Sequence, residues 1–294
     1  MPSILPQLII NGLIAGSIYA LAACGFALVY YVLKFQYFSH GAIISIGAYM
    51  FFLFLNLMGL NYVLAGILAI GISILAALAT NWLVYRPMRK RKATPTTVLI
   101  ASIVVLMCVS SLMLALFGAS TKTLSLSSQN VTFDLGSFTI TAIQISIVIL
   151  ALALFFLLWI IMKKTRLGKA MRAIADNKDV AQIVGINPEK IYNYTFIISG
   201  VMGAVAGILI GLEQNLYPKM GVIIIIKGFI GSVVGGLGSV PGSIIGGLFI
   251  GLIENVGVWF LPTGYKDVIS FSIMLLFLIF RPQGILGVKL RDDS

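Results

Sequence analysis

Two ionisable side chains interrupt long apolar runs in the carboxyl-terminal third of the sequence. Lys227 follows four isoleucines, and Glu254 follows Leu252 and Ile253. A charge inside an apolar run is costly, so such a group usually faces the protein interior and finds a partner. We therefore expect Lys227 and Glu254 to form a buried ion pair. The alternative is that Lys227 extends to an interface while Glu254 makes a hydrogen bond alone.

His40 is the only histidine, and it stands in the run from Tyr37 to Gly41. Its imidazole could contact a transported solute or brace a turn, and we take Tyr37 and His40 as candidate pathway residues. Cys24 and Cys108 lie far apart in apolar runs, which predicts two buried thiols and no metal site or redox pair. A phosphate-binding loop and a zinc-protease motif are both missing from the sequence, so we expect a protein without cofactor and without enzymatic activity.

The composition places these residues in a membrane. Of the 294 residues, 60% are hydrophobic and 10% are charged. The mean hydropathy is +1.07, far above that of soluble domains. Residues 143–162 are apolar on every face, which favours helices over a β-barrel. We expect an all-α, polytopic transmembrane bundle of about eight or nine spans, forming one transmembrane domain over residues 1–294. The candidate spans are Leu8–Leu33, Ile43–Leu60, Val63–Tyr85, Thr96–Phe117, Ile140–Met162, Ile191–Leu212, Val222–Gly236, Pro241–Phe260 and Val268–Phe280.

The net charge of +11 comes from short basic blocks between the spans. Such blocks stay on the cytoplasmic side of a membrane, so the charge indicates topology and no nucleic acid. Residues 86–92 and 163–190 are therefore predicted to be cytoplasmic, like the carboxyl end, and residues 118–137 to form an outer loop. If all nine candidates cross, the amino terminus lies outside; if one short glycine-rich piece is re-entrant, it lies inside.

A glycine-rich stretch with one proline separates the seventh and eighth candidate spans. Glycine costs about 1 kcal/mol and proline about 3 kcal/mol per helix position relative to alanine, which predicts a break there. Broken helices in transporters point their ends at the substrate, so this break is a candidate part of the pathway. The alternative is a tight external hairpin between two ordinary spans. The candidate residues are Gly235, Gly236, Gly238, Ser239 and Gly242.

The cytoplasmic loop at 163–190 has the pattern of a short amphipathic helix. Its apolar positions Leu167, Ala170, Met171 and Ile174 repeat with helical spacing, and Gly185 is suited to end a second short helix. The basic residues Arg166, Lys169 and Arg172 fall mainly off this apolar stripe. Such an element can lie on lipid or fit into a groove of a partner protein, and the residues alone favour neither.

Several short motifs, in order and nearly end to end, resemble the H-type permease subunit of bacterial high-affinity branched-chain amino acid ABC importers. The motifs are Gly16–Leu21, Tyr37–Gly41, Tyr85–Pro87, Arg166–Ala173, Gly185–Asn187, Gly235–Gly242, Tyr265–Asp267 and Arg281–Gly287. The resemblance implies an inner-membrane permease that pairs with an M-type permease, two cytoplasmic ATPases and an extracytoplasmic binding protein.

The resemblance also implies that the cytoplasmic loop docks on an ATPase. The residues that it places at or near this contact are Arg166, Leu167, Gly168, Lys169, Met171, Arg172 and Gly185. Family members usually have Asn-Phe-Ala-His-Gly-Glu where this chain has Tyr37 to Ala42, which leaves the substrate open between branched-chain amino acids and related small amphiphiles. The rival functions are an ion-coupled secondary transporter and a passive channel for small neutral solutes such as urea.

Overall fold

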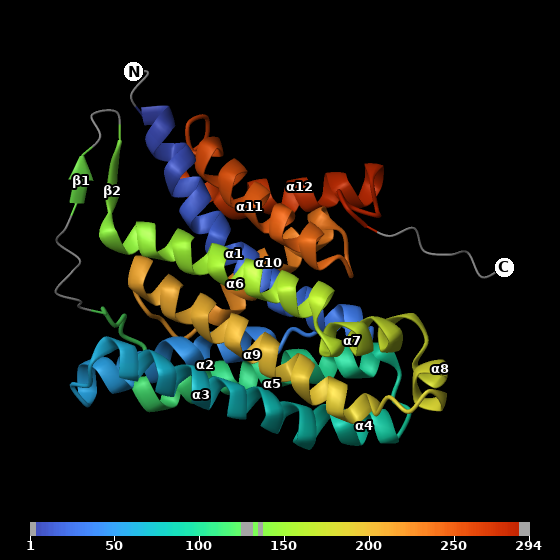
Figure 1. The fold of residues 1–294 in the computed structure, drawn as a ribbon. Coiled ribbons are helices and arrows are strands. Elements are labelled where there is room, and N and C mark those ends of the chain that lie inside the picture. Colours follow the sequence, from blue (N-terminus) through green and yellow to red (C-terminus); the bar gives the residue numbers. More distant parts are fainter. Residues whose placement is uncertain (1–3, 125–131, 135–137, 288–294) are drawn as a thin grey trace.

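The computed structural model describes residues 4–124, 132–134 and 138–287, and Figure 1 shows that they form a bundle of helices. The α-helices are α1 (Ile4–Leu33), α2 (His40–Phe52), α3 (Tyr62–Thr80), α4 (Arg86–Lys90), α5 (Pro95–Phe117), α6 (Ala142–Lys164), α7 (Arg166–Asp176), α8 (Lys178–Ile183), α9 (Pro188–Glu213), α10 (Met220–Gly235), α11 (Val240–Gly257) and α12 (Lys266–Phe280). Two π-helical turns, η1 (Leu53–Leu57) and η2 (Asn81–Tyr85), continue α2 and α3, and a 3₁₀ turn, η4 (Thr263–Tyr265), precedes α12. Strands β1 (Thr132–Asp134) and β2 (Thr139–Thr141) form an antiparallel hairpin in which Thr132 faces Thr141.

The predicted all-α membrane bundle is confirmed. Among the described residues, eight helical segments are long and apolar enough to cross a membrane. The seventh candidate, Val222–Gly236, corresponds to α10, which has 16 residues. At about 1.5 Å per residue it spans about 24 Å, less than the ~30 Å hydrocarbon core of a bilayer. Helix α10 therefore does not cross the bilayer by itself.

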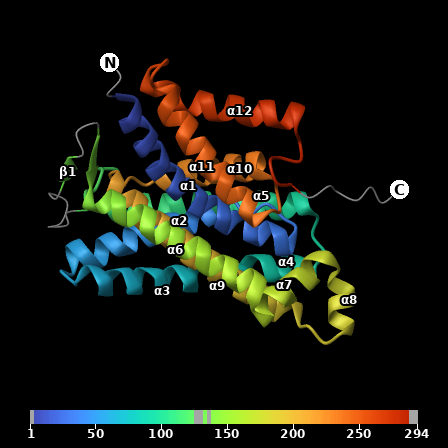
Figure 2. The same ribbon diagram turned by 45° about the horizontal axis from the view of Figure 1, so that its top comes forward.

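The amino terminus of α1 lies on the side of the predicted outer loop. The Gln7 side chain accepts a hydrogen bond from the Thr139 backbone N–H at 2.9 Å and donates one to the Thr139 carbonyl oxygen at 3.1 Å. Helices α7 and α8 lie at the far end of α6 (Figures 1 and 2). With the basic loops in the cytoplasm, as predicted, α1 begins outside, which is the side expected if all nine candidates cross. Helix α10 and the loop before it, whose Leu216 pairs with Lys122, then make one crossing together. Residues 125–131 and 135–137 of the predicted outer loop, and the tail from 288, lie outside the described residues.

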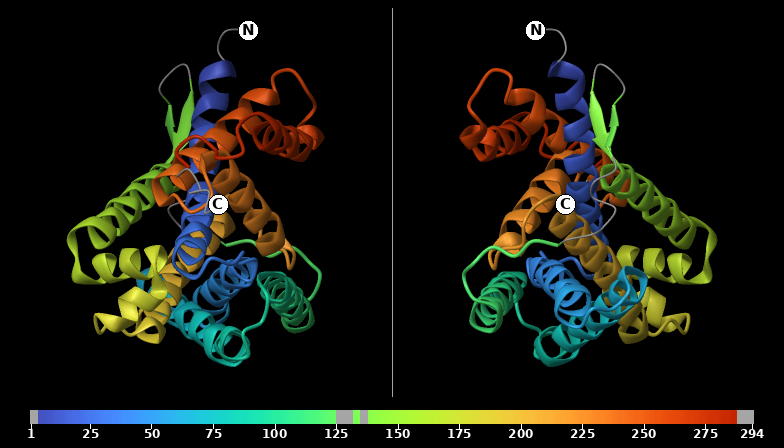
Figure 3. Two further views of the ribbon diagram at one scale, coloured as in Figure 1. Left: turned by 90° about the vertical axis from the view of Figure 1, so that its right-hand side faces the viewer. Right: turned by 90° about the vertical axis from the view of Figure 1, so that its left-hand side faces the viewer.

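Helix α1 is the centre of the bundle, and residues 16–29 are buried without interruption. Figure 3 shows it surrounded by the other helices. It packs on α11 through glycines: a Cβ atom on Gly12 would lie 2.9 Å from Leu252 Cα, and one on Gly251 would overlap the Gly16 backbone. Lipid provides no hydrophobic drive between helices, so this close backbone approach must hold them together.

One sequence expectation about this bundle is wrong. Cys24 is buried as predicted, but Cys108 is exposed. It lies on the outer face of α5, where Val104 and Met107 are also exposed. A membrane span is apolar on all sides, so hydropathy does not distinguish the face that meets the bundle from the face that meets lipid or another chain.

We expect Gly251→Ala to lower the free energy of unfolding by about 1–3 kcal/mol, because the added methyl group must push α11 away from α1. Gly71→Ala is the matched control, since a Cβ atom on Gly71 in α3 meets no atom within 4 Å. That control should be neutral or stabilising by up to about 1 kcal/mol. Thermal unfolding in detergent measures both variants, and equal midpoints would contradict the packing argument.

Candidate functional site

Two helices begin inside the bundle, and their first turns touch. Helix α2 starts at His40, after the segment Lys34–Ser39 has turned back from the cytoplasmic end of α1. Helix α10 starts at Met220, after a loop whose Leu216 pairs with Lys122 on the outer side. A Cβ atom on Gly41 would lie 2.6 Å from the Gly221 carbonyl oxygen, so the two first turns are in backbone contact.

The geometry of these two first turns is typical of a solute pathway. Neither start has a side-chain N-cap, whereas α6 and α9, which begin at the ends of the bundle, both have one. Helix N-termini carry positive potential, and broken helices with their ends at membrane depth bind substrate or ions in transporters. The junction of α2 and α10 can therefore attract a negatively charged group.

His40 lies at the first turn of α2 and is fully buried. Its Nδ1 atom pairs with the Ser199 hydroxyl at 3.1 Å, and its ring fills a slot between two glycines. A Cβ atom on Gly25 or Gly203 would lie 2.5 or 2.8 Å from the imidazole. The structure thus gives His40 a packing and bracing role between α1 and α9, and its contact with a solute stays a prediction.

Unpartnered polar atoms follow His40 along α2. The Nε2 atom of His40 and the hydroxyls of Ser45 and Tyr49 are buried and make no hydrogen bond within the described part of the chain. Buried polar atoms normally have partners, supplied by water where protein gives none. Helix α2 therefore has polar atoms available for water or a solute along its inner surface.

Tyr37 belongs to an aromatic cluster that fixes the re-entrant segment before α2. Its ring lies 5.2 Å from that of Phe196 and 5.8 Å from that of Tyr85. The Ser39 hydroxyl bonds to the Tyr85 hydroxyl, and the Ser39 N–H donates to the Ser102 hydroxyl at 2.8 Å. Helix α5 and the π-turn η2 thereby hold the entry to α2 at membrane depth.

A second aromatic group closes the cytoplasmic side of the α2–α10 junction. Phe26, Phe38 and Phe229 meet with ring centres 5.2–5.8 Å apart, from α1, the re-entrant segment and α10. The sequence analysis did not identify Phe229. Its position two residues after the buried Lys227 could have indicated that it lies near the protein interior. The three rings pack against one another at this level.

Cavities flank the junction on both sides of the membrane, and both lie against α5. The outer cavity, about 310 Å³, is lined by Ser110, Ser111 and the Tyr217–Lys219 segment that leads into α10. The inner cavity, about 230 Å³, is lined by Lys34–Gln36, which leads into α2, and by Pro95 and Thr96. Each cavity lies beside a segment that leads into one of the two helix starts.

The glycine-rich break is present between α10 and α11, and it forms a tight turn. Gly236 and Gly238 have φ values of +115° and +85°, which favour glycine. The Ser239 hydroxyl accepts a hydrogen bond from the Gly242 N–H at 3.2 Å and caps α11. The backbones of Gly235 and Gly242 approach so closely that a Cβ atom on either would overlap the other residue.

This turn lies beside Tyr30 at the end of α1, which is the predicted cytoplasmic end of the bundle. The Leu286 N–H of the carboxyl-terminal segment bonds to the Gly235 carbonyl oxygen at 2.9 Å. The turn is a hairpin at the end of the bundle and not a break at membrane depth. It differs from the predicted alternative in lying on the predicted cytoplasmic side and in following the short helix α10. A pathway role for these residues stays a prediction, and turn geometry accounts for the glycines.

Lys227 and Glu254 are brought together inside the bundle. The Lys227 ammonium contacts the Glu254 carboxylate, and their side chains are 4% and 1% exposed. Asp267 at the start of α12, which the sequence analysis did not assign, adds a second carboxylate at 2.7 Å from Lys227 Nζ, and the Ser270 hydroxyl donates to Glu254. This cluster joins α10, α11 and α12 through one ammonium group.

The predicted cytoplasmic loop at 163–190 is folded onto the bundle. The Thr165 hydroxyl caps α7 by accepting from the Gly168 N–H at 3.1 Å, and Gly168 itself presses on the last carbonyls of α6. Met171 is buried, and Arg172 donates to the Met162 carbonyl oxygen. Leu167 is half-buried, Arg166 and Lys169 are exposed, and Gly185 has a φ of +86° just after α8.

Three apolar side chains on and just after α8 face outward. Val180, Ile183 and Val184 are 54%, 84% and 69% exposed. Helix α8 is not one of the spans, so these side chains form an apolar patch on the cytoplasmic loop. The sequence analysis did not predict the patch. It could have been found from the apolar residues that follow the predicted stripe of α7 within an otherwise charged loop.

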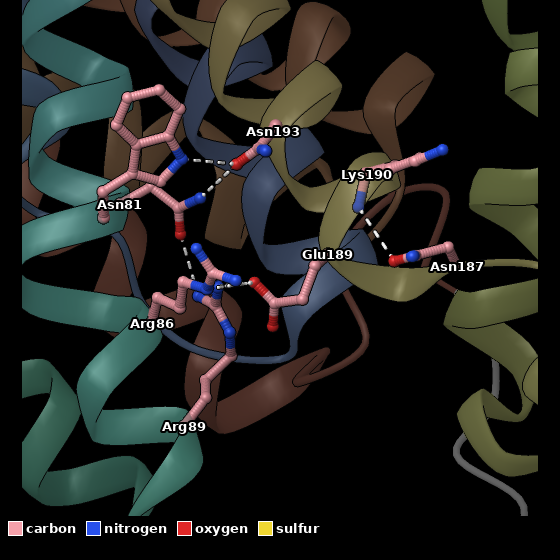
Figure 4. Close-up of polar contacts among 8 residues, drawn as sticks. Asn81, Arg86, Arg89, Asn187, Glu189, Lys190 and Asn193 are labelled. Carbon is pink, nitrogen blue, oxygen red and sulfur yellow. Dashed lines mark hydrogen bonds and ion pairs between the residues drawn. The ribbon is translucent and has the colours of Figure 1, made fainter.

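A polar network fixes the exit from this loop, where α9 begins (Figure 4). Glu189 accepts from Arg89 at 3.1 Å and lies 3.6 Å from the Arg86 guanidinium. Asn193 accepts from the Asn81 amide at 2.8 Å, and Arg89 also donates to Asn81 at 2.9 Å. The network connects the start of α9 to α4 and η2 at the end of the bundle where the basic residues lie.

The fold is that of a polytopic helical membrane protein. The family model described as "branched-chain amino acid transport system / permease component" matches residues 8–278, and the chain belongs to this family. The chain is 34% identical to the high-affinity branched-chain amino acid transport system permease proteins BraD of Pseudomonas aeruginosa and LivH of Escherichia coli, and each match covers 96% of this chain and 95% of the relative. The structure is similar to PsaBC from Streptococcus pneumoniae in complex with Fab, with a TM-score of 0.50 at 13% identity over 95% of this chain and 92% of that chain. The chain is therefore an inner-membrane transport subunit that works within a larger ABC system.

We expect Lys227→Met to destabilise the protein by about 3–5 kcal/mol, because it leaves Glu254 charged and unpaired in the interior. The double variant Lys227→Met/Glu254→Gln removes both charges and should recover most of that loss. Asp267→Asn is the control: its side chain is 67% exposed, so the change should cost about 0–1 kcal/mol. Thermal unfolding in detergent decides, and a double variant as unstable as the single one would contradict the pairing.

Proposed function

We propose that the whole chain is one permease domain that forms half of the pathway of an ABC importer, driven by separate ATPases that dock on the loop at 163–190. The observation that supports this most is the folded loop with its outward apolar patch, Val180, Ile183 and Val184. A patch of this kind on a rigid element suits a groove in a partner protein. Gly168 of α7 lies against the backbone of α6, and Met171 is buried, so a force on α7 would be transmitted directly to α6.

The substrate is a branched-chain amino acid or a related small amphiphile. The names of the similar permeases support a branched-chain amino acid. The junction of α2 and α10 could bind either a branched-chain amino acid or another small amphiphile. Two helix N-termini suit a carboxylate, while Phe38 and Phe229 provide apolar surface next to them. The rings close the inner side, so the solute would reach the junction from the outer cavity first.

The partners are an M-type permease, two cytoplasmic ATPases, an extracytoplasmic binding protein and membrane lipid. The face of α5 that carries the exposed Val104 and Met107 lies beside both cavities and is the surface offered to the second permease. The ATPases bias a two-state pathway between outward and inward access. Substrate selection rests largely on the binding protein.

Reconstitution in liposomes tests this function. The chain, its partner permease, the ATPases and the binding protein should together accumulate leucine above its external concentration when ATP is supplied. Omitting the ATPases should abolish accumulation. Uphill uptake by the chain alone on an ion gradient would indicate a secondary transporter instead, and mere equilibration with all components present would indicate a channel.

The apolar patch supplies a sharper prediction. Ile183→Asp places a charge in the proposed docking surface and should weaken ATPase binding by about 2 kcal/mol, or about thirtyfold. Ile183→Leu keeps the surface apolar and is the matched control. Co-purification of the ATPases and ATP-driven uptake are measured at equal membrane insertion. Full ATPase binding by the Ile183→Asp variant would contradict docking at this patch.

A further inference from the structure

A separate cavity lies at the cytoplasmic end of the bundle, on the side of α6 and α11. Its volume is about 290 Å³, and it is formed by α1, α6, α7 and the turn that begins α11. It lies apart from the two cavities along α5, with which it shares no lining residue. Gly238 and Ser239 line it, but no residue of the two first turns at the α2–α10 junction does.

The lining changes from apolar to basic along α6. Phe155 and Leu158 of α6 face Val240 and Ile244 of α11 in the deeper part. Lys163 stands eight residues beyond Phe155, about 12 Å further along the helix and toward the cytoplasm. The cavity therefore joins an apolar slot in the membrane to a basic rim at its surface.

The rim has positive charge and interfacial aromatic side chains. Lys163 and Arg172 line it, and the lining residues include no carboxylate. The Lys163 ammonium lies 5.9 Å from the centre of the Trp159 ring, and Tyr31 completes the rim from α1. Trp and Tyr are typical of the headgroup level of a bilayer, so the rim lies where lipid phosphates are.

We infer that this cavity binds an anionic phospholipid, with the phosphate on Lys163 and Arg172 and part of one acyl chain between α6 and α11. Basic pockets between spans on the cytoplasmic side suit anionic headgroups. The uninterrupted apolar depth requires a ligand that also has a hydrocarbon chain. A free phosphate would use the rim and leave the slot unfilled.

Lipid retention by the full-length chain, purified in detergent and measured by native mass spectrometry, tests the inference. The probes are phosphatidylglycerol, phosphatidylethanolamine and inorganic phosphate. Phosphatidylglycerol should be retained most, and Lys163→Ala should weaken its binding about fivefold, because one cation near the surface contributes about 1 kcal/mol. Lys164→Ala is the matched control, because Lys164 is the adjacent exposed lysine and does not line the cavity.

A second variant tests the slot. Ile244→Trp fills the apolar part and leaves both cations in place, so it should also reduce phosphatidylglycerol retention. Equal retention by the Lys163→Ala and Lys164→Ala variants would overturn the site. So would equal retention of both lipids, or binding of inorganic phosphate as strong as that of phosphatidylglycerol. In a Cys108→Ser background, cross-linking of Ile244→Cys to another subunit would show a protein in the slot and would also overturn it.

Discussion

Backbone contact through glycine around α1 is the constraint on which the other features depend. Gly12 and Gly16 meet α11, Gly228 of α10 meets α1, and a Cβ atom on Gly231 would lie 2.9 Å from Gly247. These contacts make α1, α10 and α11 one tightly packed unit. Because α10 is fixed in this way, its first turn can lie against α2 at membrane depth, although the helix is too short to span a bilayer.

The two helix starts inside the bundle are supported from opposite sides of the membrane. The segment before α2 comes from the cytoplasmic end and is held by Tyr85 and Ser102, while the loop before α10 comes from the outer side. Lys227, two turns into α10, binds carboxylates on α11 and α12. A displacement of α10 would therefore have to keep this cluster together or expose unpaired charge in the membrane, which is costly.

The cytoplasmic face connects the loop to the rest of the chain at two places. Helix α7 presses on the end of α6 through Gly168, and Glu189 fixes the start of α9 to Arg86 and Arg89. Lys163 and Arg172 also share a cavity with the α10–α11 turn. A movement of the loop would thus reach α6 and α9 directly, as the proposed coupling to separate ATPases requires.

Hydropathy alone determined the class of protein and most of the helical spans, because both follow from local composition. The basic blocks predict which loops are cytoplasmic, and that assignment stays a prediction. The glycine-rich break and the amphipathic stripe of α7 are also local patterns, and both were visible in the sequence. The burial of Lys227 against a second carboxylate, the slot around His40 and the outward direction of Ile183 were decided by tertiary structure. Each depends on which face of an evenly apolar helix meets which neighbour. The sequence of a span without polar periodicity does not indicate which face that is.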